Sequence, residues 1–158
     1  NGHRAVLHGN EIIYVIEERA AHRPPLVSGV GVRLPSHLTA TGRAILSALP
    51  RNQVRALYPN RQAFTDRTGI GPKSPKELEA TLAETQRTGF AEEHGDVTPG
   101  FDSYAVAVRD YNDFPIAGLA LTFVSGSLRP EQERSLKTKL RLAGAELSRR
   151  LGAVGSLT

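Results

Sequence analysis

The sequence predicts an α+β fold, with an antiparallel sheet and helices packed beside it. Candidate strands arrive mainly as hairpins and candidate helices as separate blocks, which is the order typical of this class. The strands also lack the unbroken Val/Ile runs of a parallel sheet that is buried on both faces. With 158 residues, of which 39% are hydrophobic and 23% charged, the chain has the size and composition of one globular domain.

The N-terminal part predicts a β-hairpin. Arg4–His8 and Glu11–Glu17 are the two strands, and the turn dipeptide Gly9-Asn10 joins them. Pro24-Pro25 then breaks the chain, and a short extended piece is expected at Leu26–Ser28.

The sequence next predicts three helices. A helix is expected near Thr39–Leu49, where Pro50 ends it, and a short helix around Asn52–Tyr58. Residues 59–73 have almost no apolar pattern, and we expect an exposed loop. The next helix starts at Ser74, with Pro75 in the first position, Glu77 completing a capping box and Gly89 as the stop.

The C-terminal half predicts the clearest hairpin, Ser103–Arg109 with Pro115–Val124, after a short strand at Phe90–Glu92. A long amphipathic helix is expected from Pro130. Its apolar stripe consists of Leu136, Leu140, Ala143, Leu147 and Leu151. We interpret this stripe as the side that packs on the sheet, with a membrane-surface or partner-helix role as the alternative.

Composition excludes several function classes. The absence of cysteine excludes disulfides, thiolate ligands and a cysteine nucleophile. The net charge is +4, but the arginines are spread along the chain and are not interleaved with aromatic residues, so we do not expect this domain to bind nucleic acid. The longest apolar stretch, Ile116–Val124, is interrupted by Thr122 and is far shorter than the roughly 20 residues a membrane-spanning helix needs. We find no secretory signal and expect a cytoplasmic protein.

The segment from Leu34 to Ala44 is the best candidate for ligand binding. Its small residues lie where an extended loop turns into a helix, and free backbone N–H groups at such a point favour a carboxylate or phosphate. Small side chains at 40–42 would let an anion approach the backbone, and Thr39 or Thr41 would add a hydroxyl donor. The alternative is a capped helix whose small residues only allow tight packing.

Other candidate chemistry is weaker. A metal site could be read from four potential ligands close together in the sequence, with His37 as a fifth: Glu92, Glu93, His94 and Asp96. Neighbouring residues of a strand point to opposite faces, however, so these side chains would not converge and we expect no metal site. Ser103 opens a strand and is not in a G-x-S-x-G turn, and no partner histidine is identified. We therefore assign no catalytic residue and no cofactor.

Two series of motifs resemble the effector-binding domain of IclR-type bacterial transcription regulators. The first series is Leu34-Pro35-x-His37-x-Thr39-Ala40-x-Gly42-Arg43-Ala44-x-Leu46. The second is Gly89-Phe90-Ala91, Pro99-Gly100, Tyr104-Ala105-Val106-Ala107-Val108-Arg109-Asp110 and Pro115-Ile116-Ala117-Gly118-Leu119. Their order and spacing agree across essentially the whole chain. Two departures concern the pocket: Ser103 stands where many members carry cysteine, and Ala107 where proline is usual.

The resemblance implies a curved antiparallel sheet flanked by helices, similar to GAF-type sensor domains. It implies that residues 1–158 are a single effector-binding domain, and that a winged helix-turn-helix DNA-binding domain, absent from this chain, precedes it. It also implies a homodimer or homotetramer and a small organic acid or aromatic effector. DNA would be contacted only through the missing domain.

Carried over by position, the resemblance also implies which residues line the effector pocket. They are Leu26, Leu34, Ala40, Thr41, Gly42, Glu93, Ser103, Ala120 and Thr122. The expected function is ligand sensing without turnover. The alternatives are a small hydrolase using Ser103 or the Glu93/His94 pair, and an oligomerisation module without a ligand.

Overall fold

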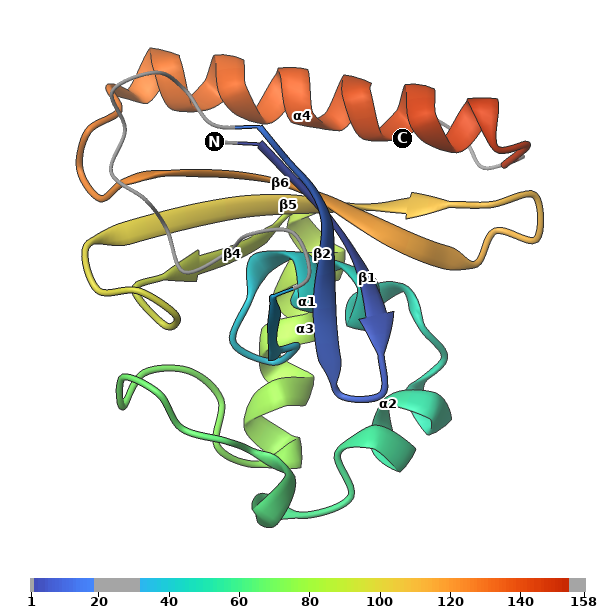
Figure 1. Cartoon of the computed structure of the whole chain (residues 1–158), viewed down its shortest axis with the longest axis vertical. Coiled ribbons are helices and arrows are strands. Elements are labelled where there is room, and N and C mark those ends of the chain that lie inside the picture. The colour runs from blue at the N-terminus through green and yellow to red at the C-terminus, as the bar shows by residue number, and fades with distance from the viewer. Residues whose placement is uncertain (1, 19–31, 154–158) are drawn as a thin grey trace.

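The computed structural model describes residues 2–18 and 32–153, which form one curled antiparallel sheet with helices on both faces (Figure 1). The strands are β1 (Gly2–His8), β2 (Glu11–Glu18), β3 (Arg33–Pro35), β4 (Ala91–His94), β5 (Phe101–Arg109) and β6 (Pro115–Val124). The helices are α1 (Ala40–Ala48), α2 (Arg51–Leu57), α3 (Pro75–Thr88) and α4 (Pro130–Arg150), with a 3₁₀ turn at Arg61–Ala63. The predicted α+β class is confirmed.

The strand order in the sheet is β3-β2-β1-β6-β5-β4, and neighbouring strands are antiparallel. Both predicted hairpins are present. The pairing of β1 with β6 joins the N-terminal hairpin to the C-terminal hairpin, with His3 opposite Ala120 and Ala5 opposite Gly118. The sheet therefore brings N-terminal side chains beside those of the C-terminal hairpin.

Local sequence rules account for the helix ends. The Ser74 hydroxyl accepts from the Glu77 amide at 3.2 Å, Pro75 occupies the first turn of α3, and Gly89 ends this helix with a positive φ of 82°. The chain re-enters the sheet only after this turn. For that reason β4 begins at Ala91, one residue later than predicted, and it continues to His94.

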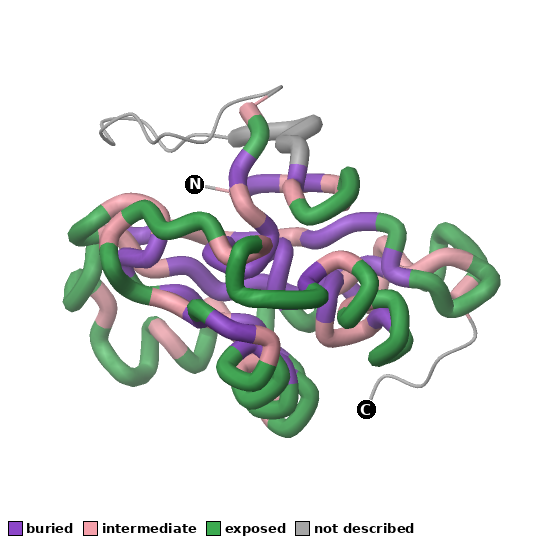
Figure 2. The backbone as a smooth tube through the Cα atoms, turned by 90° about the horizontal axis from the view of Figure 1, so that it is seen from below, coloured by how far each residue is buried: buried purple, intermediate pink, exposed green. Residues whose placement is uncertain are grey.

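The two faces of the sheet have different cores. On one face, buried alanines of α1 and of strands β4, β5 and β6 form a close-packed cluster: Ala40, Ala44, Ala91, Ala105 and Ala120. On the other face, α4 packs on larger side chains, and the buried cluster there is Phe90, Tyr104, Val106, Phe123 and Leu140. Figure 1 shows α4 on the opposite side of β5 and β6 from α1 and α3, and Figure 2 shows the buried residues between these layers. Alanines let α1 approach the sheet closely.

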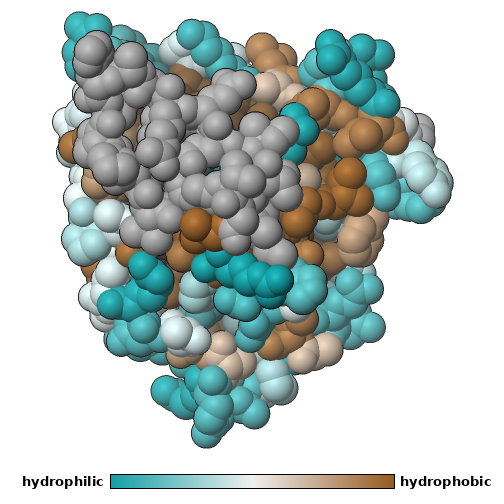
Figure 3. All heavy atoms as spheres, viewed as in Figure 1, coloured by the Kyte–Doolittle hydropathy of each residue, from teal (hydrophilic) through white to brown (hydrophobic). Residues whose placement is uncertain are grey.

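The amphipathic helix α4 packs on the sheet through part of its predicted stripe. Leu140 is buried and Leu136 partly buried, whereas Ala143 and Leu151 are exposed. Hydrophobic residues also gather on the surface over β6 beside α4 (Figure 3). Within residues 2–18 and 32–153, every helix is too short or too polar to cross a bilayer.

The predicted extended piece at Leu26–Ser28 lies outside the described residues. The loop at 59–73 is largely exposed, as predicted, but Phe64 anchors it. The Phe64 ring lies 5.2 Å from that of His37 and 5.0 Å from that of the buried Tyr58.

Candidate functional site

The start of α1 is built by a threonine cap. The Thr39 hydroxyl accepts from the Gly42 amide at 2.9 Å and lies 3.4 Å from the Ser36 carbonyl oxygen. The prediction that Thr39 would offer a hydroxyl to a ligand is therefore wrong, and so is the prediction of a free amide at Gly42. The amides of Ala40 and Thr41 occupy the first two helical positions, and we find no acceptor for either among the described residues.

Close backbone contacts fix this end of the helix. A side chain on Gly42 would collide with the Ser36 backbone, with Cβ only 2.5 Å from its Cα. Thr41 is buried, and its methyl group lies against Gly118 of β6, where a Cβ atom would also collide. The first turn of α1 is thus seated directly on its own preceding loop and on the sheet.

A row of polar side chains crosses the sheet on the face that α1 covers. The register places Glu93 of β4 opposite Ser103 of β5, and Ser103 opposite Thr122 of β6. Glu93 and Ser103 are buried, with 4% and 7% of their surfaces exposed, and the Ser103 and Thr122 hydroxyl oxygens are 2.8 Å apart. One carboxyl group and two hydroxyl groups therefore meet at one place on this face, beside the buried alanines.

Burial raises the pKa of Glu93 to about 7. The nearby Ser103 hydroxyl and the Asp96 amide oppose this shift, since both stabilise the carboxylate, and the amide donates to Glu93 Oε2 at 3.0 Å. Near neutral pH the carboxyl group therefore exists in both forms. In its protonated form it donates a hydrogen bond, which an ordinary glutamate cannot do.

Stability should fall as the pH rises through neutrality. The folded pKa of Glu93 is raised from 4.5 to about 7, so its stabilising contribution is complete below about pH 4.5 and is lost as the pH passes 7. Urea unfolding between pH 5 and 8 should show a decline that the Glu93→Gln variant lacks. An equal decline in both proteins would contradict the raised pKa.

A buried ion pair lies next to Glu93. The Arg43 guanidinium pairs with Asp96, and both side chains are almost fully buried. Its remaining N–H groups donate to the His37 carbonyl at 2.8 Å and to the Glu92 carbonyl at 2.7 Å. Arg43 thus ties α1 to β4 on either side of Glu93.

The loop before α3 forms hydrogen bonds both with the segment after β4 and with His37, which precedes α1. The Thr68 hydroxyl donates to the Asp96 carbonyl at 3.2 Å, and His37 Nε2 lies 2.9 Å from the Thr65 carbonyl oxygen. Burial lowers the pKa of His37. This histidine therefore packs as a neutral ring and does not join Glu93.

The alternative arrangements considered from the sequence do not form. Glu93 and His94 point to opposite faces of β4; His94 is exposed and contacts Glu92 and Asp102, each at 3.2 Å. Ser103 bonds to Thr122 and not to a histidine. No three potential metal ligands of the His, Cys, Asp or Glu type converge within the part of the chain that the structure describes.

Most of the predicted pocket residues lie on one face of the sheet. Ala40, Ala120 and the Glu93 row share it, and Thr41 and Gly42 lie at the adjoining helix start. Leu34 is buried in a separate cluster with Ala5 and Ile12. Leu26 lies outside the described residues.

Sequence reasoning missed His3 and the Arg43–Asp96 pair. His3 is buried opposite Ala120 on the same face as Glu93, a position that depends on the pairing of β1 with β6. Arg43 is part of a motif that the sequence shows, but Asp96, the carboxylate with which it pairs, is 53 residues away.

Comparison with known proteins agrees with this fold. The family model for the C-terminal region of the bacterial transcriptional regulator IclR matches residues 2–149. The chain is 29% identical over 150 residues to the HTH-type transcriptional regulator XynR of Escherichia coli K12, covering 95% of this chain and 59% of that protein. It is 30% identical over 157 residues to the glycerol operon regulatory protein of Streptomyces coelicolor, covering 96% and 59%.

A solved structure gives the same result. The crystal structure of the Agobacterium tumefaciens repressor BlcR superposes with a TM-score of 0.81 at 28% identity, covering 98% of this chain and 60% of that chain. The chain thus spans about three fifths of the length of these regulators. It belongs to the IclR family of bacterial transcriptional regulators and corresponds to their C-terminal region.

Proposed function

We propose that this domain senses a small carboxylate-bearing molecule, aliphatic or aromatic, between the start of α1 and the polar row of β4, β5 and β6. The observation that carries the proposal is the alignment of the buried Glu93 and Ser103 with the partly buried Thr122 across three strands. Buried polar groups on an apolar face are the usual means of orienting a small ligand.

The ligand carboxylate would accept hydrogen bonds from the Ala40 and Thr41 amides and from the Thr41 hydroxyl. Its other polar atoms would meet Glu93, Ser103 and Thr122, while Leu34 and, as a prediction, Leu26 would cover its apolar part. The raised pKa of Glu93 supports a carboxylate guest, because a protonated Glu93 donates to the guest and does not repel it.

Binding would change DNA affinity indirectly. A ligand that favours one arrangement of a dimer or tetramer shifts the population of that arrangement. The name of the relative XynR, an HTH-type regulator, supports a separate helix-turn-helix domain as the part that contacts DNA.

A thermal-shift screen with aliphatic and aromatic acids tests the proposal. A specific ligand at 100 times its dissociation constant adds about 2.7 kcal/mol of stability, and it should be recovered chemically intact. Conversion of the ligand would favour the hydrolase alternative. Failure of all such acids to stabilise the chain would favour the ligand-free oligomerisation alternative.

Thr41→Val should weaken the ligand found in this screen by about 1–3 kcal/mol, because a buried acceptor would lose its donor. The substitution keeps the methyl group that packs against Gly118, so the fold should be unaffected. Isothermal titration calorimetry measures the change, with Thr138→Val on the exposed face of α4 as the matched control. Equal affinities of wild type and Thr41→Val would remove Thr41 from the site.

A further inference from the structure

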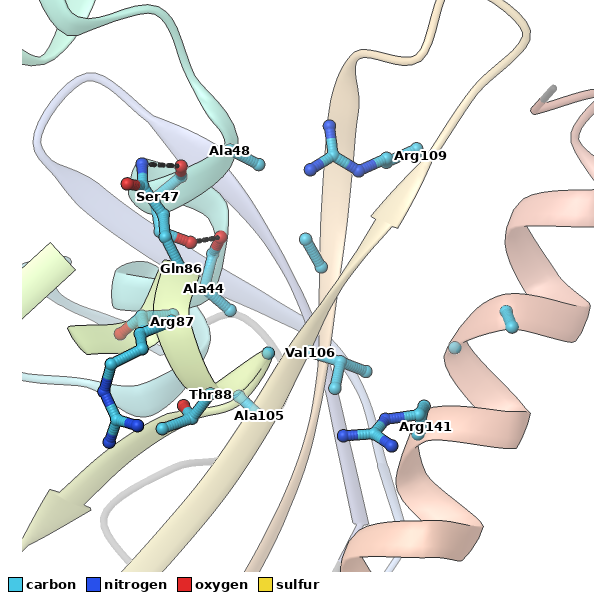
Figure 4. A pocket seen from close by; sticks show the side chains of 15 residues that line it. Ala44, Ser47, Ala48, Gln86, Arg87, Thr88, Ala105, Val106, Arg109 and Arg141 are labelled. Atoms are coloured by element: carbon cyan, nitrogen blue, oxygen red, sulfur yellow. Dashed lines mark hydrogen bonds between the residues drawn. The ribbon is translucent and has the colours of Figure 1, made fainter. Parts of the chain in front are cut away.

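A cavity of about 510 Å³ lies beside the part of β5 beyond Ala105, where the pairing with β4 stops, and its lining does not include Thr41, Glu93, Ser103 or Thr122. Helices α1 and α3 flank it on one side and α4 on the other (Figure 4). Its volume is within the range of small-molecule sites.

The edge of β5 offers this cavity the backbone amide of Ala107, which has no acceptor among residues 2–18 and 32–153. The Gly100 carbonyl accepts from Ser125 at the β6 side and the Phe101 carbonyl from Gly95 at the β4 side, each at 2.9 Å, so alternate residues of β5 face alternate neighbours. Ala107 belongs to the set that faces β4. Because β4 starts at Ala91, opposite Ala105, it has no residue to pair with Ala107.

The cavity wall is positively charged. Among the residues that the structure describes, the lining includes Arg87, Arg109 and Arg141 with Gln86 and small residues, and it includes no carboxylate. Arg87 is paired with Glu84, and Arg109 lies 3.8 Å from Asp113.

Arg141 differs from the other two arginines. Its guanidinium lies 4.8 Å from the centre of the Phe90 ring, and within residues 2–18 and 32–153 it has no ion-pair partner. Stacking on a ring holds a guanidinium in place and leaves its N–H edge free to bind an anion.

The charge pattern indicates what would bind. A second copy of the same edge would bring like charges together, which is unfavourable, so β5-to-β5 pairing does not suit this cavity. Figure 4 shows Arg109 and Arg141 projecting from β5 and α4 at different levels of the cavity, with the apolar Val106 between them. A ligand that contacts both needs an acidic group at each end and an apolar body between them.

We propose that this cavity is a second ligand site, distinct from the effector pocket, and that it binds a small dicarboxylate. One carboxylate pairs with Arg141 and the other with Arg109, and the Ala107 amide donates to one of them. The aliphatic body lies on Val106, Ala107 and Ala145.

Calorimetric titration with succinate, glutarate and adipate tests the site, and the diamide of the best member serves as a neutral control. Arg141→Gln and Arg109→Gln should each weaken binding at least about tenfold, the effect of losing a charge-assisted hydrogen bond. Arg134→Gln removes the same charge from an exposed position of α4 outside the cavity, and it should change affinity less than about twofold.

A backbone variant tests the amide separately. Ala107→Pro removes the amide hydrogen that faces the cavity but no hydrogen bond to β6, and an edge position tolerates proline. It should weaken binding about tenfold, the effect of one hydrogen bond to a charged acceptor.

Three results would overturn the proposal. The first is an equal loss in Arg134→Gln and Arg141→Gln, which indicates unspecific charge attraction. The second is binding of an acidic peptide without binding of any dicarboxylate. The third is dicarboxylate binding that Thr41→Val weakens and Arg141→Gln does not, which places the ligand in the effector pocket and leaves the proposed function intact.

Discussion

Replacing Arg43 with methionine should lower the free energy of unfolding by about 3–5 kcal/mol, the usual effect of removing one partner of a buried ion pair. The Asp96 carboxylate would remain buried without its counter-charge. The carbonyl oxygens of His37 and Glu92 would lose their donors at the same time. Urea denaturation followed by circular dichroism measures the change.

The surface pair of Arg51 and Glu79 provides the matched control. Arg51 is 73% exposed, so Arg51→Met should change stability by less than about 1 kcal/mol. The double variant Arg43→Met with Asp96→Leu should regain part of the loss, because it removes the stranded charge. A loss below about 1 kcal/mol in Arg43→Met would show that the pair does not hold α1 to β4.

Gly42→Ala should destabilise the fold by about 3 kcal/mol, the upper part of the usual range for overpacking. The new Cβ atom would lie 2.5 Å from Ser36 Cα and 2.7 Å from its carbonyl carbon. Backbone atoms cannot rotate away as the end of a long side chain does. The start of α1 would have to move, and effector binding should be lost with it.

Whether Gly42→Ala destabilises or stabilises the chain distinguishes steric overlap from helix propensity as the dominant effect. Helix propensity alone predicts that Gly42→Ala stabilises the chain by about 1 kcal/mol. In Gly2→Ala, the new Cβ atom would have its nearest neighbour, Leu121, at an ordinary 3.8 Å, so this control should be nearly neutral. A stabilised Gly42→Ala variant would mean that the loop before α1 yields easily. Thermal unfolding of the three proteins decides the question.

Local patterns in the sequence were enough to predict most elements. The Ser74 cap with Gly89 defined α3, and the turn around Asp110–Phe114 defined the β5–β6 hairpin. These features depend on residues a few positions apart, where sequence spacing and spatial distance coincide. The position that we propose for the ligand site rests on the same kind of local pattern, since small residues at a helix start are visible in one segment.

Contacts between distant segments could not be predicted in this way. His3 lies on this face of the sheet because β1 pairs with β6. Asp96 lies beside Glu93, where it pairs with Arg43 of α1, a residue far away in the sequence. The role of Thr39 was wrong for a different reason. A threonine at a helix start serves equally well as a cap or as a ligand donor, and only the geometry around Gly42 distinguishes the two.

Strand β5 carries two sets of residues that alternate along it. Ser103 and Ala105 face α1, while Tyr104 and Val106 face α4. A substitution in the first set therefore changes the surface that faces α1 and leaves the surface that faces α4 unchanged. Deletion or insertion of one residue in the middle of this strand would turn all residues beyond it to the opposite face, which would place small side chains against α4 and large ones against α1.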